Sequence, residues 1–346
     1  MTFPVTEHIV KTARHTTFYL SCGSPERTPI IFVHGWPELS ISWRHQLPCF
    51  GALGFHAVAP DMRGYGRSGA PREHKDYAME EIVQDMIELI DALGQDRAVW
   101  VGHDWGSPVV WNLASHHPER CHGVASLCVP YFPGGSRIAH YMRLVDRSVY
   151  PQNEFPAGQW EYILFYSEQF EKAQAVFEAN VQNTVKALFR SGSPRGLGKP
   201  SRTAFVRRDG GWFGGAAEAP EMELDTKIMT EEDLSSYVAA LERTGFFGPG
   251  SYYVNDELNA SYSERAKDGG KLTMPVLFLH GVYDQTCQTV TSSFAEPMRG
   301  ACPHLSEVFI DSGHWMAQEK PAEVNAALAH WLATEIPQVW LRKTTP

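Results

Sequence analysis

The chain has 346 residues, of which 43% are hydrophobic and 20% are charged, as expected of a folded globular protein. Its formal net charge of −10 and its lack of a basic stripe argue against nucleic acid as a partner. No apolar stretch approaches the roughly 20 residues of a membrane-spanning helix, and residues 1–7 lack the pattern of a secretory leader. The 6 cysteines show no paired spacing, which indicates reduced thiols and a cytoplasmic location.

Strands and helices are expected to alternate at both ends of the chain. Apolar runs predict strands at residues 18–20, 30–34, 56–59, 98–101, 124–129, 274–280 and 307–310. Apolar residues at helical spacing predict helices at 80–93, 108–117 and 321–333. This alternation predicts a doubly wound α/β sheet, mostly parallel, with helices on both faces.

Residues 132–257 interrupt this alternation. The segment is rich in aromatic residues, glycine and proline, and it lacks the apolar runs of buried strands. Helices are predicted at 177–189 and at 231–243, the second beginning after a capping residue, Thr230. We therefore expect a mainly helical lid at 132–257, inserted into one catalytic core domain formed by residues 1–131 and 258–346.

Asp104 occupies the centre of a motif that joins an expected strand to an expected helix. Small residues stand two positions to either side of it, at Gly102 and Gly106, as a sharp strand-to-helix turn requires. Such a turn presents its central residue as a nucleophile, although an aspartate at a helix start can also serve only as a cap. A carboxylate is ionised at neutral pH and can attack the sp3 carbon of an epoxide or an alkyl halide without a base. The product is an ester, which water must then cleave.

Asp284 and His314 complete an order of nucleophile, acid and histidine along the chain. Asp284 follows the strand expected at 274–280, and His314 follows the strand at 307–310. Open α/β sheets place their sites at the carboxyl ends of strands, so the three side chains are expected to meet there. In that arrangement His314 takes a proton from water, and Asp284 orients the imidazole and stabilises its charged form. A single histidine among 15 would more often be structural, but the order of the three residues indicates catalysis.

The loop after the strand at 30–34 contains Trp36. In a sheet of this kind that loop supplies one main-chain N–H to an oxyanion hole, and the residue after the nucleophile supplies another. These would be the amides of Trp36 and Trp105. They would stabilise the negative charge that develops when water attacks the ester of Asp104.

A glycine-rich run at residues 64–69 matches the spacing of a dinucleotide-binding fingerprint. That fingerprint should open a helix directly after a strand, whereas here no helix is expected for about ten residues. We therefore interpret the run as a turn at the rim of the site, and we expect no cofactor. No metal-ligand spacing occurs in the sequence, so no metal is expected either.

Four motifs together carry a family resemblance: His34-Gly35-Trp36-Pro37, Asp61-Met62-Arg63-Gly64-Tyr65-Gly66-Arg67-Ser68, Gly102-His103-Asp104-Trp105-Gly106 and Ser312-Gly313-His314-Trp315. With them, nearly the whole chain resembles the α/β-hydrolase-fold epoxide hydrolases of the soluble type. The resemblance implies an α/β-hydrolase core with a helical cap, and hydrolysis of a small-molecule epoxide by water to a vicinal diol. It specifies neither the particular epoxide nor the oligomeric state.

The resemblance also implies two lid tyrosines whose hydroxyls hold and protonate the epoxide oxygen. One lies in an acidic–tyrosine pair upstream of a helix that ends in leucine, phenylalanine and arginine, which selects Tyr162, with Tyr166 as the alternative. The other follows a glycine- and proline-containing stretch whose spacing selects Tyr253 over Tyr252. A neutral phenol with a pKa of about 10 is a suitable acid for a far more basic alkoxide.

Two other functions are compatible with parts of this pattern. A haloalkane dehalogenase shares the fold and the aspartate nucleophile, but it needs two N–H donors for the halide. Trp105 could give one through its indole, whereas the position that often supplies the second, with an asparagine, is occupied by Trp36. The pair of tyrosines also favours an epoxide. A binding protein or receptor that has lost turnover should lack a catalytic residue, and none of the three is missing.

Overall fold

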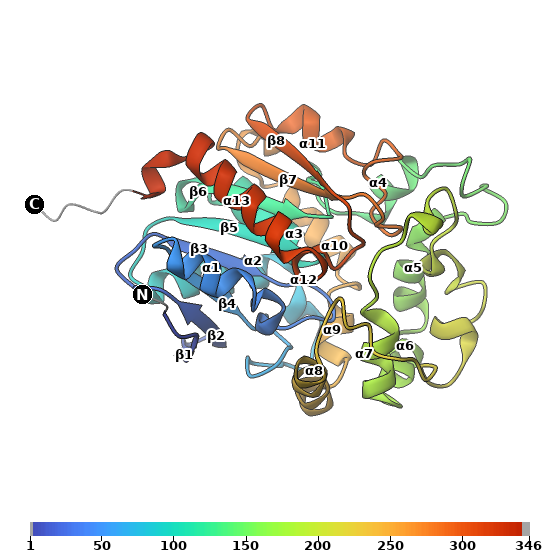
Figure 1. The fold of residues 1–346 in the computed structure, drawn as a ribbon. Coiled ribbons are helices and arrows are strands. Elements are labelled where there is room, and N and C mark those ends of the chain that lie inside the picture. Colours follow the sequence, from blue (N-terminus) through green and yellow to red (C-terminus); the bar gives the residue numbers. More distant parts are fainter. Residues whose placement is uncertain (1–2, 341–346) are drawn as a thin grey trace, which may run out of the picture.

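An eight-stranded sheet forms the centre of the computed structural model, which describes residues 3–340 (Figure 1). Its strand order is β1-β2-β4-β3-β5-β6-β7-β8. The strands are β1 Thr6–Lys11, β2 Thr16–Cys22, β3 Pro29–Val33, β4 His56–Pro60, β5 Ala98–His103, β6 Cys121–Leu127, β7 Val276–Gly281 and β8 Leu305–Ile310. Strands β3 to β8 run parallel, whereas β2 is antiparallel to both of its neighbours, β1 and β4.

Every strand predicted from an apolar run is present, and one strand, β1, is not predicted by the sequence. Strands β5 and β7 are buried along their whole length, which explains their continuous apolar sequences. Strand β1 lies at the edge of the sheet, and its residues are exposed or half-buried. An edge strand of this kind has no apolar run by which it could be recognised.

Helices cover both faces of the sheet (Figure 1). On one face α1 (Gln46–Ala52) contacts α13 (Pro321–Glu335), and on the other α2 (Met79–Ala92) contacts α3 (Gly106–His116). The three helices predicted for these parts of the chain, α2, α3 and α13, agree with the structure to within two residues at each end. Two shorter helices, α11 (Glu296–Ala301) and α12 (Met316–Glu319), adjoin the last strand.

The described chain between β6 and β7 contains helices and turns but no strand. Its helices are α4 Ile138–Arg143, α5 Glu161–Glu168, α6 Phe170–Glu178, α7 Val181–Leu188, α8 Glu231–Thr244, α9 Phe247–Ser251 and α10 Asp256–Ser263. Helices α4 to α7 lie beyond the carboxyl ends of the parallel strands (Figure 1). Helix α8 confirms the helix predicted after Thr230, whose side chain accepts a hydrogen bond from the main chain of Asp233.

The single helix predicted at 177–189 is wrong, because the structure has two helices, α6 and α7, on either side of Asn180. Asn180 has an extended backbone, with φ −151° and ψ 90°, and its side chain accepts a hydrogen bond of 3.0 Å from the Asn183 amide. A capping asparagine offers the main chain an alternative to helical bonding, so the periodic pattern alone does not reveal the break.

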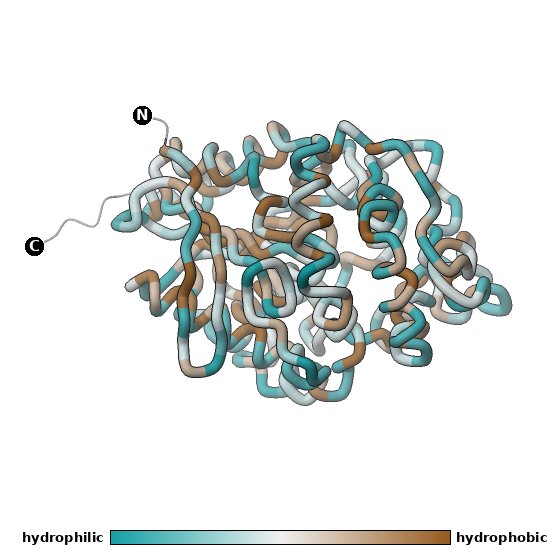
Figure 2. The backbone as a smooth tube through the Cα atoms, turned by 90° about the horizontal axis from the view of Figure 1, so that it is seen from below, coloured by the Kyte–Doolittle hydropathy of each residue, from teal (hydrophilic) through white to brown (hydrophobic). Residues whose placement is uncertain are grey.

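The apolar residues lie mainly in the central strands, with hydrophilic residues toward the peripheral turns (Figure 2). Large side chains such as Phe32, Trp100 and Trp111 are almost completely buried in this core. The packed strands fix the positions of the loops at their carboxyl ends, from which the site is built. Within residues 3–340, no helix has the length and apolarity needed to cross a membrane.

Candidate active site

Asp104 lies at the tip of a tight turn between β5 and α3, and its backbone has a φ of 48°. This left-handed conformation is rare for a residue with a side chain and costs about 1–3 kcal/mol. A Cβ atom on Gly102 would collide with the main chain of Gly106, and one on Gly106 with the carbonyl of Val33. The small residues of the motif are therefore required by close contact, and the turn holds the Asp104 carboxylate at the end of the sheet.

His314 lies between the carboxylates of Asp104 and Asp284. Its Nε2 is 3.3 Å from Oδ2 of Asp104, and its Nδ1 is 2.8 Å from Oδ2 of Asp284. The other oxygen of Asp284 accepts main-chain N–H bonds from Thr286 at 2.8 Å and from Cys287 at 3.1 Å. These bonds fix the Asp284 carboxylate, which in turn orients the imidazole toward Asp104.

The charges of the two carboxylates determine the protonation of His314. Burial lowers the pKa of His314, but the charge of Asp284 and the hydrogen bonds to both carboxylates outweigh it and raise that pKa well above its usual value. For Asp284, burial raises the pKa, and the attraction and hydrogen bond of His314 outweigh burial and lower it. The free site therefore favours an imidazolium between two carboxylates.

The Trp36 amide donates a hydrogen bond of 2.6 Å to Oδ1 of Asp104. A Cβ atom on Gly35 would overlap the Asp104 side chain, so this loop approaches the carboxylate as closely as glycine permits. Trp105 stands at the N-terminal end of α3, where main-chain N–H groups have no acceptor within the helix. Donors at these two places suit a negative charge on Oδ1, while Oδ2 faces His314.

Tyr162 and Tyr253 both line a cavity that also contains Asp104. Their rings pack edge to face, with centroids 5.6 Å apart. Burial raises the pKa of each phenol well above its usual value, and the charge of Asp104 raises it further. Both hydroxyls are therefore neutral and can donate a proton into the cavity.

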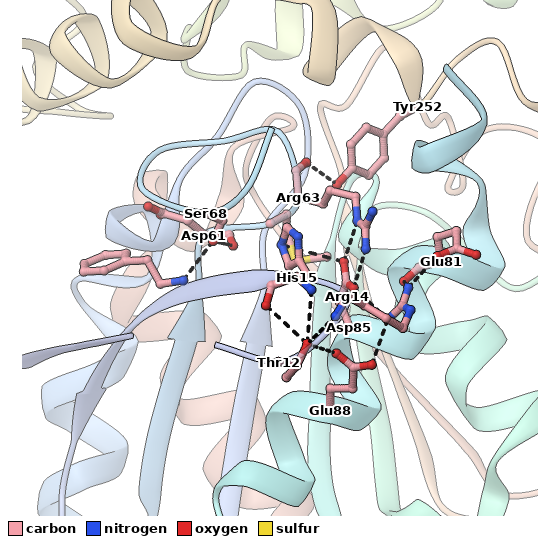
Figure 3. A network of polar contacts seen from close by, with 12 residues as sticks. Thr12, Arg14, His15, Asp61, Arg63, Ser68, Glu81, Asp85, Glu88 and Tyr252 are labelled. Atoms are coloured by element: carbon pink, nitrogen blue, oxygen red, sulfur yellow. Dashed lines mark hydrogen bonds and ion pairs between the residues drawn. The ribbon is translucent and has the colours of Figure 1, made fainter. Parts of the chain in front are cut away.

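The hydroxyls of the two alternative tyrosines are placed differently, although Tyr252 also lines the cavity. The Tyr252 hydroxyl donates to the carbonyl of Arg63 at 2.9 Å, and the Arg63 guanidinium is paired with Asp85 in a buried polar network (Figure 3). Tyr166 stacks on Tyr253 at 4.5 Å and does not line the cavity. The geometry thus favours Tyr162 and Tyr253 as the donors.

Glu38 and His103 belong to the site and were missed by the sequence reasoning. The Glu38 carboxylate accepts hydrogen bonds from the Gly35 amide at 2.9 Å and from Nδ1 of His103 at 2.7 Å. Burial raises the pKa of Glu38 and lowers that of His103, but their mutual attraction outweighs burial, giving pKa values of about 2 and about 10 respectively. The two residues form a buried ion pair. No local pattern pairs these two residues, because they stand 65 positions apart in the sequence.

Among residues 3–340, two groups of side chains bring possible metal-ligand atoms within 4.8 Å of one another: His103, Cys128 and His314, and Asp284, Cys287 and His314. Both depend on His314, whose two nitrogens already face Asp284 and Asp104.

The glycine-rich run at 64–69 forms a turn, as predicted, and the Asp61 carboxylate accepts main-chain N–H bonds from Ser40 at 2.9 Å and Arg67 at 3.0 Å. A Cβ atom on Gly66 would overlap this carboxylate.

Comparison with known proteins agrees with this architecture. The model of the α/β hydrolase fold family matches residues 28–321. The chain is 34% identical to epoxide hydrolase A of Mycobacterium tuberculosis over 94% of its length and 97% of that protein. It is also 35% identical to bifunctional epoxide hydrolase 2 of Sus scrofa over 88% of its own length and 51% of that protein. The chain thus spans about half the length of several curated relatives that it matches.

The crystal structure of epoxide hydrolase A from Mycobacterium thermoresistibile superimposes with a TM-score of 0.79 and 31% identity, covering 96% of this chain and 99% of that one. The chain therefore belongs to the α/β-hydrolase fold family. Within that family it is a member of the epoxide hydrolases. These comparisons confirm the predicted fold class and the resemblance.

Proposed function

We propose that the protein is an epoxide hydrolase that converts epoxides to vicinal diols through a covalent ester on Asp104. One observation carries the proposal above others. The Asp104 carboxylate, with Oδ1 on the Trp36 amide at 2.6 Å, shares a cavity with two neutral tyrosine hydroxyls, those of Tyr162 and Tyr253. A nucleophile beside acids suited to an alkoxide matches an epoxide better than a halide.

In the first step, Oδ2 of Asp104 attacks one epoxide carbon. The bond from that carbon to the epoxide oxygen breaks as the ester bond forms, and the electron pair passes to the oxygen. Tyr162 and Tyr253 donate hydrogen bonds to that oxygen, and a phenol proton neutralises it as it becomes a hydroxyl. The attack needs no base, because the carboxylate is already an anion.

In the second step, His314 removes a proton from water, and the resulting hydroxide attacks the ester carbonyl carbon of Asp104. Negative charge develops on Oδ1, where the amides of Trp36 and Trp105 stabilise it. The ester bond then breaks, and the leaving diol oxygen takes a proton from the imidazolium. The carboxylic acid formed on Asp104 loses its proton, and the tyrosinate left by the first step regains one, so the site returns to its starting state. Esterification removes the charge of Asp104, so the pKa of His314 falls in the intermediate and the imidazole becomes available as a base.

We also propose that residues 132–257 act as a lid domain over a core made of residues 1–131 and 258–346. Helix α5 carries Tyr162, and Tyr253 is the second residue after α9, so this segment supplies both proton donors. The six cysteines, all of which are free thiols, support a cytoplasmic location.

Incubation of the purified protein with styrene oxide and, separately, with 1-bromobutane tests the proposed reaction. We expect the diol from styrene oxide and no bromide from 1-bromobutane. Bromide release without diol would assign a haloalkane dehalogenase, and binding of both compounds without turnover would assign a binding protein.

A further inference from the structure

The cavity at Asp104 is mainly apolar and partly open to solvent. Its volume is about 80 Å³, and its walls include the apolar side chains of Pro108, Val129, Ile138, Trp160 and Ile163. It continues outward to polar residues such as Ser167, which is exposed. A substituent on one epoxide carbon therefore has an apolar path from the nucleophile toward the surface.

The space on the other side of the two donor tyrosines is filled by four aromatic side chains, which we call the aromatic plug: Trp36, Phe177, Trp212 and Phe246. Phe177 lies 5.3 Å from both Trp36 and Trp212 and 5.2 Å from Phe246, measured between ring centroids. Trp36 stacks on Trp212 at 5.9 Å. The four side chains are between 1% and 8% exposed, and none of them lines the cavity.

The donor tyrosines form the boundary between the cavity and the aromatic plug. Tyr162 lines the cavity and packs against Trp212 with ring centroids 5.7 Å apart. Tyr253 lines the cavity and packs against Trp36 at 6.0 Å. An epoxide whose oxygen is held by both hydroxyls thus lies with one side toward open space and the other toward packed rings.

Trp212 comes from the segment between α7 and α8. In the segment 210–215, all residues except Trp212 have a positive φ, including Phe213 at 56°. Its indole nitrogen is buried and has no hydrogen-bond partner among the described residues. Packing alone therefore holds the ring, and a smaller apolar residue can replace it without breaking a hydrogen bond.

We propose that Trp212 is a specificity-determining residue that restricts the enzyme to terminal epoxides, which carry a substituent on one ring carbon only. The two substituents of a trans-1,2-disubstituted epoxide point to opposite sides of the ring. One of them would enter the cavity and the other would overlap the aromatic plug, which is packed too closely to admit it. This inference rests on the proposed epoxide hydrolysis and adds the substrate class.

The test compares kcat/KM for styrene oxide, trans-β-methylstyrene oxide and trans-stilbene oxide, which place hydrogen, methyl and phenyl on the second carbon. For the unmodified protein we expect a graded loss, reaching about 100-fold or more for trans-stilbene oxide. Trp212→Ala and Trp212→Leu should raise the ratio of trans-stilbene oxide to styrene oxide by about 10-fold or more.

Trp160→Ala is the matched control. It removes the same kind of ring, 2% exposed, from the wall of the open cavity, so it should not raise that ratio. Equal hydrolysis of styrene oxide and trans-stilbene oxide by the unmodified protein would overturn the inference while leaving epoxide hydrolysis in place. An equal rise in the ratio for the Trp160 and Trp212 variants would overturn the role of Trp212. Absence of diol from all three epoxides would instead contradict the proposed function itself.

Discussion

His103 donates a hydrogen bond of 2.7 Å through Nε2 to the main-chain carbonyl of His314, so the residue before the nucleophile supports the loop of the general base. The opposite nitrogen of His103 bonds to Glu38, which also accepts from the amide of Gly35. This ion pair thus joins the turn of Asp104 to the two loops that supply the base and the oxyanion hole. These three segments are far apart in the sequence, and their relative positions depend on the buried charges of Glu38 and His103.

Removing one of these charges should be costly. We expect Glu38→Gln to lower the free energy of unfolding by about 3–5 kcal/mol, because it leaves the His103 imidazolium buried without its partner. The double variant Glu38→Gln/His103→Gln should be less destabilised than the sum of the single changes, since neither charge is then left unpaired. Urea unfolding of the four proteins measures this coupling, and strict additivity would show that the pair does not act as a unit.

The same pair predicts how stability depends on pH. The pKa of Glu38 is lowered from 4.5 to about 2, so its contribution is present above pH 4.5 and is lost as the pH falls toward 2. The pKa of His103 is raised from 6.5 to about 10, so its contribution is complete below pH 6.5 and is lost as the pH rises toward 10. The stability difference between the unmodified protein and the double variant should therefore be largest between about pH 4.5 and 6.5. Urea unfolding across pH 4 to 10 measures it, and a difference that is independent of pH would contradict the charged pair.

His314→Gln should trap the ester on Asp104. Attack by the carboxylate requires no base, whereas hydrolysis of the ester requires His314 to deprotonate water. Intact-protein mass spectrometry after addition of styrene oxide should show a stoichiometric gain of one substrate mass. Binding of the epoxide without any adduct would mean either that His314 is not the hydrolytic base or that alkylation itself needs it.

The origin of the diol oxygens tests the ester directly. In a single turnover in ¹⁸O-water, the first diol should carry no label, because one oxygen comes from the epoxide and the other from Asp104. The label should appear in the Asp104 carboxylate, which peptide mass spectrometry can detect. Label in the first diol would indicate direct attack of water on the epoxide and would contradict the two-step mechanism.

The sequence predicts those parts of the fold whose signal is local. Buried strands have apolar runs, and the tight turn at Asp104 needs glycines at contact distance, so both can be recognised in one short window. The edge strand β1 and the break at Asn180 are not predicted, because an exposed strand lacks an apolar run and a capping side chain interrupts an otherwise regular helical pattern.

The site shows the same division between local and tertiary signals. The order of Asp104, Asp284 and His314 along the chain is enough to bring them together, since each follows a strand of one parallel sheet. The partnership of Glu38 with His103 and the aromatic plug around Trp212 are contacts between distant segments. No local pattern marks them, so only the three-dimensional structure reveals them.

Tyr162 and Tyr253 should share one role in the alkylation step. Each hydroxyl can donate to the same epoxide oxygen, so loss of one leaves the other in place. Tyr162→Phe and Tyr253→Phe should each slow alkylation by roughly 10- to 1000-fold, and the double change should nearly abolish it. Hydrolysis of the ester should be much less affected, because no epoxide oxygen then remains to be protonated.

The alternative residues provide the controls for these two tyrosines. Tyr252→Phe removes a hydroxyl that donates to the Arg63 carbonyl, and Tyr166→Phe removes one on a ring outside the cavity, so neither should slow alkylation comparably. Pre-steady-state tryptophan fluorescence can follow the step, because Trp36 and Trp105 lie beside the ester. If the Tyr162 and Tyr253 variants alkylate at the unmodified rate while a control variant does not, the proton donor is that control residue, and the proposed assignment is wrong.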